Sequence, residues 1–252
     1  MSRRFRLGLF ALAGPGLAVV LLLGLHGLPA FGHFRGLYGV LANRLEPPLR
    51  HATDIVTALN FDLRAFDTLG EEFILFGSVS GVALLLRQLR DEHKDERNRD
   101  VADHRFADAS DALRVTSLIL IPLAFALGAY VVVHGQLTPG GGFQGGVVLA
   151  AGPIAILLAG RYFALKALAP AWALEALDSI GAGAYALIGL GGLIFASVYL
   201  QNFLPLGTPG KLLSAGTMPL NSLAVGIEVT GAFLLTWTEF LDQALIVERG
   251  AR

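Results

Sequence analysis

The chain has 252 residues, of which 54% are hydrophobic and 15% charged, and its formal net charge at pH 7 is −1. A soluble domain normally carries about 25% charged residues, so the composition points away from a soluble fold, and the near-zero charge predicts no nucleic-acid partner. There is no cysteine, and the six histidines include no pair three or four residues apart, so disulfides and iron–sulfur clusters are excluded and we expect no metal site, haem or other cofactor.

Apolar stretches long enough to cross about 30 Å of hydrocarbon recur along the chain. They predict an all-α, polytopic membrane protein with about six transmembrane helices, two in a first block and four in a second. The predicted spans cover residues 7–28, 72–89, 115–134, 143–163, 176–200 and 220–245.

The first predicted span contains Pro15 and follows three arginines, which resemble the basic start of a signal peptide. Its apolar part is too long for a typical signal peptide and no small-residue cleavage site follows it, so we expect an uncleaved anchor. Residues 50–67 are too polar and too short to span. They are expected either at the membrane interface or as a re-entrant segment.

Carboxylates gather just before the second predicted span, in the segment NFDLRAFDTLGEE at residues 60–72. Two interpretations stay open. Thr68 and Glu71 have the spacing of a capping box, which satisfies free amides at a helix start. Alternatively, ionisable groups at the membrane boundary mark an ion path. The candidates here are Asp62, Arg64, Asp67, Glu71 and Glu72. Glu71→Gln would separate the two, because glutamine keeps the cap and removes the charge.

Residues 90–114 are dense in charges of both signs and predict a solvated linker between the two blocks. With six spans, this linker and both termini lie on the same side of the membrane, and most of the basic residues lie on that side too. By the positive-inside rule, the linker and both termini are expected in the cytoplasm, in a multi-pass protein of the cell (inner) membrane.

The stretch HGQLTPGGGFQGGVV at residues 134–148 separates the third and fourth predicted spans. It lacks the Lys-Ser/Thr of a phosphate-binding loop, so a nucleotide site is not expected. Glycines allow positive φ and close backbone approach, which predicts a tight hairpin at a subunit contact, needed for assembly rather than ion chemistry. The hairpin residues are Pro139, Gly140, Gly141, Gly142, Phe143, Gln144, Gly145 and Gly146.

Ionisable side chains in the later spans add two ion-path candidates, Glu228 and His134. Glu228 falls inside the sixth predicted span, where a buried, protonated glutamate without a transport role is an equal alternative. His134, one turn after Tyr130, also fits a hydrogen-bonded interfacial anchor. The remaining acids have simpler explanations. Glu175 and Asp178 would open the fifth helix favourably for its dipole, whereas Glu239 and Asp242 would reach the cytoplasmic interface.

Two glycine-rich motifs resemble a known family. TPGGGFQGGVV at residues 138–148 is similar to the signature of the B subunit of Mrp-type multisubunit sodium/proton antiporters. LPLGTPGKLLSAGTMPLNSLAVGIEV at residues 204–229 resembles that family's second glycine-rich turn and last helix. The turn residues are Gly207, Gly210, Gly216 and Asn221. The resemblance covers about residues 115–245.

The segment at residues 60–72 resembles the end of the large A subunit of the same antiporters, with matches at Asp62, Arg64, Asp67, Thr68, Gly70 and Glu71. Related small subunits occur in membrane-bound hydrogenases of the complex I superfamily. The resemblance therefore implies three parts: an A-subunit-like two-span block at residues 1–89, the charged linker at 90–114, and a B-subunit-like four-span block at 115–252.

These resemblances imply a non-catalytic membrane subunit of a multisubunit Na⁺(cation)/H⁺ antiporter, which helps to assemble the complex and contributes to the ion path. Its expected partners are large proton-pumping subunits, small subunits, the lipid bilayer, and Na⁺ and H⁺ as transported ions. One alternative is a membrane-arm subunit of a hydrogenase or another complex I relative. Another is a helical scaffold with no ion path.

Overall fold

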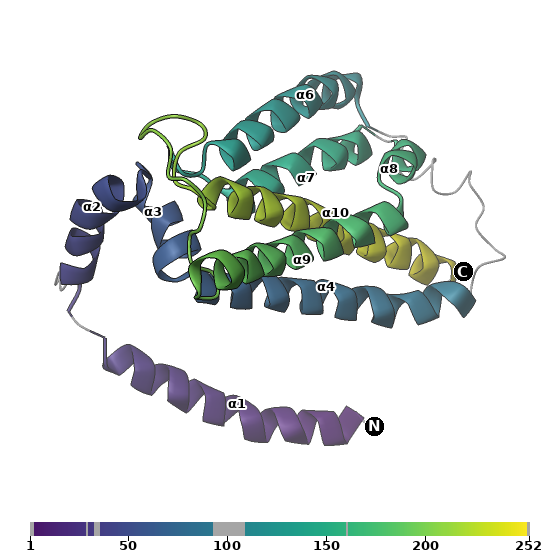
Figure 1. Cartoon of the computed structure of the whole chain (residues 1–252). Coiled ribbons are helices and arrows are strands. Elements are labelled where there is room, and N and C mark those ends of the chain that lie inside the picture. Colours follow the sequence, from purple (N-terminus) through teal and green to yellow (C-terminus); the bar gives the residue numbers. More distant parts are fainter. Residues whose placement is uncertain (1–2, 29, 33–35, 93–108, 160, 251–252) are drawn as a thin grey trace. The chain divides into compact units, whose positions relative to one another are not determined.

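The structure, a computed structural model, describes residues 3–28, 30–32, 36–92, 109–159 and 161–250 (Figure 1). Within these ranges every regular element is a helix, which confirms the all-α prediction. The contacts divide the chain into two units, Met1–Val40 and Leu41–Arg252. The first unit contains α1 (Arg3–His26), an apolar helix with Pro15 in its interior.

The second unit contains the other helices. α2 (Leu37–Arg50) crosses the boundary between the units and is followed by α3 (Ile55–Ala58) and a π-helical turn, η1 (Leu59–Leu63). The longer helices are α4 (Ala65–Glu92), α6 (Asp111–Val133), α7 (Gly142–Leu158), α9 (Ala171–Ala196) and α10 (Met218–Gly250), with the short α8 (Tyr162–Leu168) between α7 and α9.

Four helical segments of the described residues are long and apolar enough to cross a membrane. They are Ala65–Leu86, Asp111–Val133, Ala171–Ala196 and Met218–Asp242, and two shorter apolar helices are Ala13–His26 and Gly142–Leu158. These six helices lie where the six spans were predicted. The linker prediction for residues 90–114 falls largely on positions 93–108, outside the described residues.

Three predicted boundaries were wrong. The second span begins at Ala65 rather than at residue 72, because η1 leads directly into α4. The fourth predicted helix ends at Leu158 rather than at residue 163. Arg161 is the N-cap of α8, and Lys166 lies within α8. The fifth helix begins at Ala171, after Pro170. Proline has a fixed φ and no N–H, so it favours a helix start at this position.

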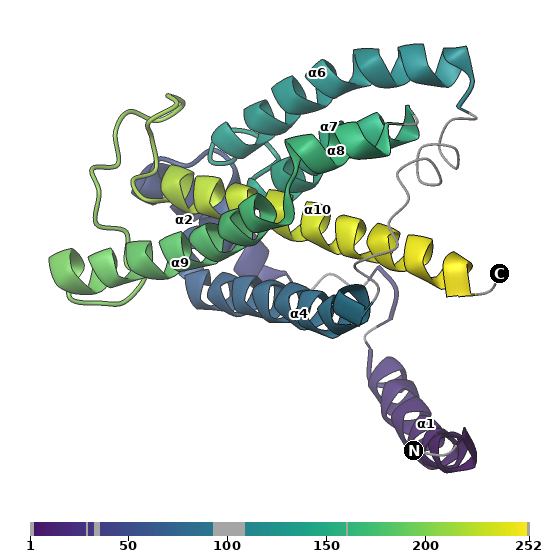
Figure 2. The ribbon, with the colours of Figure 1, turned by 90° about the vertical axis from the view of Figure 1, so that its right-hand side faces the viewer.

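Helix α10 is central in the second unit and contacts α9, α7, α4 and α6 (Figures 1 and 2). Helix α7 packs between α6 and α10. A Cβ at Gly146 would lie 2.8 Å from Val229 Cβ on α10, and one at Gly145 would lie 2.8 Å from the Val132 backbone nitrogen on α6. Glycine therefore lets three helices approach closely here. Such close packing is expected in a membrane, where the hydrophobic effect does not drive helices together.

Three loops meet at one end of the second unit, which we call the loop end: residues 51–54, residues 134–141 and residues 197–217. Gln136 is fully buried and connects all three. Its side chain donates to Leu212 O at 2.7 Å, and its carbonyl accepts from the Thr53 and Asp54 amides. We call the opposite end, where α9 begins and the α10 span ends, the α8 end.

Candidate functional site

Three carboxyl groups are buried between three apolar helices. Glu72 on α4 and Glu228 on α10 have 0% exposure, and Asp178 on α9 has 2%. Both Glu72 oxygens, both Glu228 oxygens and Asp178 Oδ1 lack a hydrogen-bond donor. No described basic side chain forms an ion pair with any of the three. Buried charge without a partner is strongly unfavourable in a membrane, so such groups usually have a function.

Two glycines bring Asp178 and Glu228 together. Gly181, one turn after Asp178, faces α10, and a Cβ there would lie 2.5 Å from Glu228 N and Glu228 Cβ. Gly231, one turn after Glu228, faces α9, and a Cβ there would lie 2.7 Å from Asp178 N. Gly181 on α9 thus contacts the backbone of Glu228 on α10, and Gly231 on α10 contacts the backbone of Asp178 on α9. This reciprocal contact sets the distance between the two acids.

The Glu72 and Glu228 side chains lie close enough for their charges to interact. A carboxylate only accepts, so a hydrogen bond between two carboxyl groups requires a proton on one of them. Two carboxyls that share a site in this way hold one proton between them, because like charges at such short range cannot both remain.

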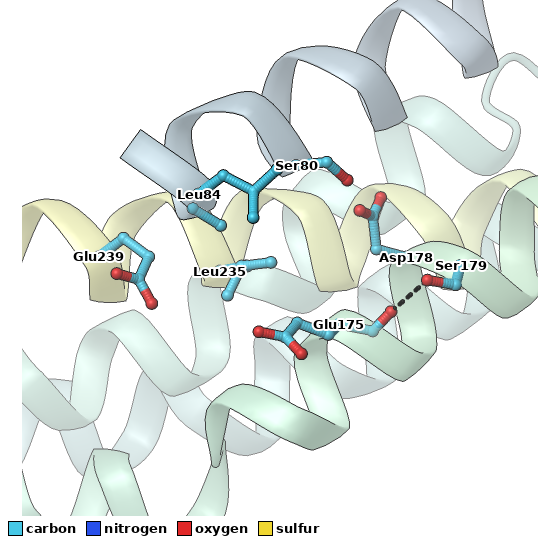
Figure 3. A pocket seen from close by; sticks show the side chains of 8 residues that line it. Ser80, Leu84, Glu175, Asp178, Ser179, Leu235 and Glu239 are labelled. Carbon is cyan, nitrogen blue, oxygen red and sulfur yellow. Dashed lines mark hydrogen bonds between the residues drawn. The ribbon is translucent and has the colours of Figure 1, made fainter. Parts of the chain in front are cut away.

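A cavity of about 240 Å³ lies between α4, α9 and α10, with Asp178 in its lining (Figure 3). The residues that line it are Ser80, Ala83, Leu84, Glu175, Asp178, Ser179, Leu235 and Glu239. Figure 3 shows that α9 contributes Asp178, α10 contributes Glu239 and α4 contributes Ser80. Among the described residues that line it, three are acidic and none is a lysine or an arginine.

Apolar packing closes the site toward the loop end. Tyr185 is fully buried, and its hydroxyl donates to Ala65 O at 3.0 Å. Phe61 packs against the Tyr185 ring, with centroids 6.1 Å apart, and Met218 belongs to the same buried cluster. Thr68 donates to Asn60 O at 2.8 Å. Of the three buried carboxyls, Asp178 therefore borders the acidic cavity, and a closed apolar core lies on the loop side.

The candidates at residues 60–72 do not form one group. Asp62 pairs with Arg50, and Arg64 with Asp67 at 2.5 Å on the exposed surface. Glu71 is exposed, and only Glu72 points into the bundle. The capping-box interpretation is wrong, because the helix begins at Ala65 and Thr68 donates to Asn60 O from inside it.

Near Asp62, α2 holds another acid. Glu46 is 4% exposed. Burial raises the pKa of the Glu46 carboxyl above its ordinary value, the charge of Asp62 raises it further, and Arg50 opposes the shift. Together with the Arg50–Asp62 ion pair, Glu46 forms a polar contact between α2 and η1 that is separate from the Glu72–Glu228 pair.

His134 has the position of an anchor. It is the C-cap of α6, its ring stacks on Tyr130 with centroids 4.1 Å apart, and its Nδ1 donates to Tyr130 O at 3.1 Å. The structure places it in the hairpin at the loop end, on a different helix from each of the three buried acids.

The hairpin glycines have close neighbours on other helices of the same chain. Gly141 has φ +120° and precedes α7, whereas Gly142, Gly145 and Gly146 lie inside that helix and are buried. Their close neighbours are α6 and α10 of the same chain. Pro139 and Gln144 are exposed, and Gly140 and Phe143 are half-buried. The close approach thus stabilises the subunit itself.

In the second glycine-rich turn, Gly207, Gly210 and Gly216 all have positive φ. Asn202 stabilises this turn by donating to Ala215 O at 2.9 Å and accepting from Thr217 N at 3.0 Å. Asn221 is buried in the first turns of α10. The turn therefore shapes the loop that leads into α10.

Sequence reasoning missed Asp178, Glu239 and Asp242 as buried groups. Because α9 begins at Ala171, Asp178 does not open the helix but lies inside it. Glu239 and Asp242 are 3% and 4% exposed, and Asp242 accepts from Lys166 of α8 at 2.7 Å. One signal was available: Asp178 and Glu228 each precede a glycine by the same three-residue spacing in an apolar span.

Comparison with known proteins identifies the family. Residues 112–235 match the domain related to the MnhB subunit of Na⁺/H⁺ antiporter. The uncharacterized protein MJ1307 of Methanocaldococcus jannaschii is 32% identical over 206 residues, which are 72% of this chain and 76% of that protein. The chain belongs to the MnhB-related family.

Two solved structures resemble this MnhB-related protein. One is a chain of the membrane-bound sulfane sulfur reductase (MBS), an archaeal respiratory membrane complex, with TM-score 0.69, 27% identity, and coverage of 94% of this chain and 98% of that chain. The other is a chain of the Mrp complex from Dietzia sp. DQ12-45-1b, with TM-score 0.69, 23% identity, and coverage of 95% of this chain and 26% of that chain. At 23% identity the likeness concerns the fold. The MnhB-related protein is thus a multi-pass membrane protein that is built like chains of multisubunit membrane complexes.

Proposed function

We propose that this MnhB-related protein is a non-catalytic subunit of a multisubunit Na⁺(cation)/H⁺ antiporter. The family description refers to a Na⁺/H⁺ antiporter subunit, and a chain of an Mrp complex has the same fold. Its partners are the large proton-pumping subunits and small subunits of the complex. Its transmembrane helices assemble with these subunits, and its buried acids form part of the ion path.

The Glu72–Glu228 pair is the observation that carries this proposal. A pair that holds one proton has a net charge of −1, and it keeps that net charge when a monovalent cation takes the place of the shared proton. When a cation binds, the shared proton leaves, and when a proton returns, the cation leaves. The charge at the site stays the same throughout this exchange, so the membrane interior never holds two unpaired carboxylates.

Two further parts of the proposal rest on sequence patterns. The block at residues 1–89 corresponds to an A-subunit tail, joined through residues 90–114 to the B-subunit-like block at 115–252. Both termini and the linker lie in the cytoplasm, which the distribution of Arg and Lys supports. In this orientation the α8 end, with the acidic cavity, faces the cytoplasm.

The test compares two neighbouring glutamates in the assembled complex. Glu72→Gln removes the titratable group inside the bundle, and Glu71→Gln makes the same change on the exposed face. We expect sodium-driven proton movement in membrane vesicles to fall at least tenfold in Glu72→Gln and to stay near wild type in Glu71→Gln, with both complexes assembled. Normal transport by Glu72→Gln would exclude the pair from the ion path.

A respiratory complex is the second candidate. The full-length likeness to a chain of MBS favours it, since the two chains cover 94% and 98% of one another. In that case the same subunit would belong to a complex that couples ion movement to electron transfer. Purification of the native complex separates the candidates, because only the second predicts iron–sulfur proteins among the partners.

A further inference from the structure

The cavity between α4, α9 and α10 has the features of a water-filled site rather than an apolar packing defect. Its volume is about 240 Å³, whereas about 15 Å³ is enough to admit one water when polar partners are present. Ser80, Ser179 and three carboxyl groups provide such partners. Glu175, Ser179 and Leu84 at its rim are exposed, so the cavity opens to the surface of the unit.

Asp178 connects this cavity to the buried pair. It lines the cavity, it is 2% exposed, and its Oδ1 has no hydrogen-bond donor from the described residues. The Gly181 and Gly231 contacts place its backbone directly beside that of Glu228. A buried carboxylate oxygen without a donor, at the inner wall of an acidic cavity, is positioned to bind water or a cation.

The acids lie at successive depths. At about 1.5 Å per residue, Glu239 is about 5 Å from the Asp242 end of the α10 span and Glu228 about 20 Å from it. Asp178 is about 10 Å from the start of α9 at the same end. The order from the α8 end is therefore Glu239, Asp178 and then the Glu72–Glu228 pair. On the far side of the pair, Tyr185, Phe61 and Met218 close the route.

We infer that this cavity is a hydrated, cation-attracting inlet that connects the α8 end alone with the Glu72–Glu228 pair, with Asp178 as the carboxyl between them. The inference rests on the proposed function for the role of the pair. It adds the route by which ions reach the pair, and it assigns Asp178 to that route. The occupants are water and hydrated monovalent cations.

The chain has no cysteine, so single cysteines report water access directly. Ser80→Cys places a thiol in the inlet, and Ser78→Cys makes the same change on the same helix, on the exposed face. In the full complex in sealed vesicles, we expect a small, cationic, membrane-impermeant thiol reagent to modify Ser80→Cys at least tenfold faster than Ser78→Cys. Modification should occur only from the side of the α8 end.

The charge of the inlet is tested with a cationic and an anionic reagent of equal size. After normalisation to a free thiol in solution, the cationic reagent should react several-fold faster with Ser80→Cys. Asp178→Asn in the same background should reduce that preference. If Ser80→Cys does not assemble, Ala83→Cys gives a second thiol on the same wall.

Two outcomes would overturn the inlet: no reaction at Ser80→Cys and Ala83→Cys from either side, or equal rates at Ser80→Cys and Ser78→Cys. Neither depends on transport, so they differ from a failure of the proposed function. One-sided labelling together with normal transport by Glu72→Gln would retain the inlet and reject the antiport role of the pair.

Discussion

At the scale of single residues, the ion pair between Lys166 and Asp242 joins α8 to α10 at 2.7 Å, with side-chain exposures of 22% and 3%. The Lys166 ammonium offsets part of the cost of burying the Asp242 carboxylate, so Lys166→Met should lower the free energy of unfolding by up to about 3 kcal/mol. Thermal unfolding in detergent measures the loss. The double variant Lys166→Met/Asp242→Asn should recover part of the loss, because asparagine replaces the buried carboxylate with a neutral side chain. A double variant less stable than the single one would contradict this role.

The adjacent residues Glu71 and Glu72 illustrate what sequence can predict at this scale. Their presence near a membrane boundary was sufficient to identify a candidate ion path. Side chains one position apart point about 100° apart on a helix, and α4 is apolar on all sides of its membrane part. No amphipathic pattern therefore indicates which acid faces the bundle. The tertiary packing against α9 and α10 decides it.

At the scale of helices, the contact between α9 and α10 depends on glycine. A Cβ at Gly181 would lie 2.5 Å from Glu228 Cβ, whereas one at Gly183 would meet nothing within 4 Å. Overpacking a close contact typically costs about 1–3 kcal/mol. Gly181→Ala should therefore lower the melting temperature of the purified complex and reduce antiport, and Gly183→Ala should change neither. Equal effects of the two substitutions would show that the contact is unimportant.

The existence of the six apolar helices could be predicted from hydropathy, but several of their ends could not. Pro170 explains the start of α9, and that signal was present in the sequence. The start of α4 was less visible, because Asp67 and Glu71 are polar but lie on its exposed face. A polar residue in the first turns of a helix resembles a residue before the helix when only hydropathy is considered.

At the scale of the whole molecule, the orientation in the membrane is open to a direct test. In the cysteine-free chain, Asp100→Cys in the predicted linker should react with an impermeant thiol reagent from the cytoplasm only. Thr208→Cys in the loop at 197–217 is exposed at the opposite end of the helices and should react from outside only. Reaction of Asp100→Cys from outside would reverse the orientation and the side on which the cavity opens.

The fold of the whole molecule could be predicted as a class, and the motif at residues 138–148 gave the family. The carboxyl site could be predicted only in part, since Glu72 and Glu228 were candidates and Asp178 was not. Three helices distant in sequence contribute these acids. Their proximity depends on glycine contacts and on which helices pack together, and no local pattern in the sequence shows this packing.

The reciprocal contacts of Gly181 with Glu228 and of Gly231 with Asp178 also restrict which substitutions this protein can accept. A methyl group at either glycine would separate two backbones and, with them, two carboxyl groups, so packing and charge spacing change in the same step. Asp178, Gly181, Glu228 and Gly231 therefore form one structural unit, in which a substitution at one position changes the surroundings of the others. A lineage could abandon the arrangement as a whole, for instance by giving up both acids, more readily than it could lose one glycine and keep the acids.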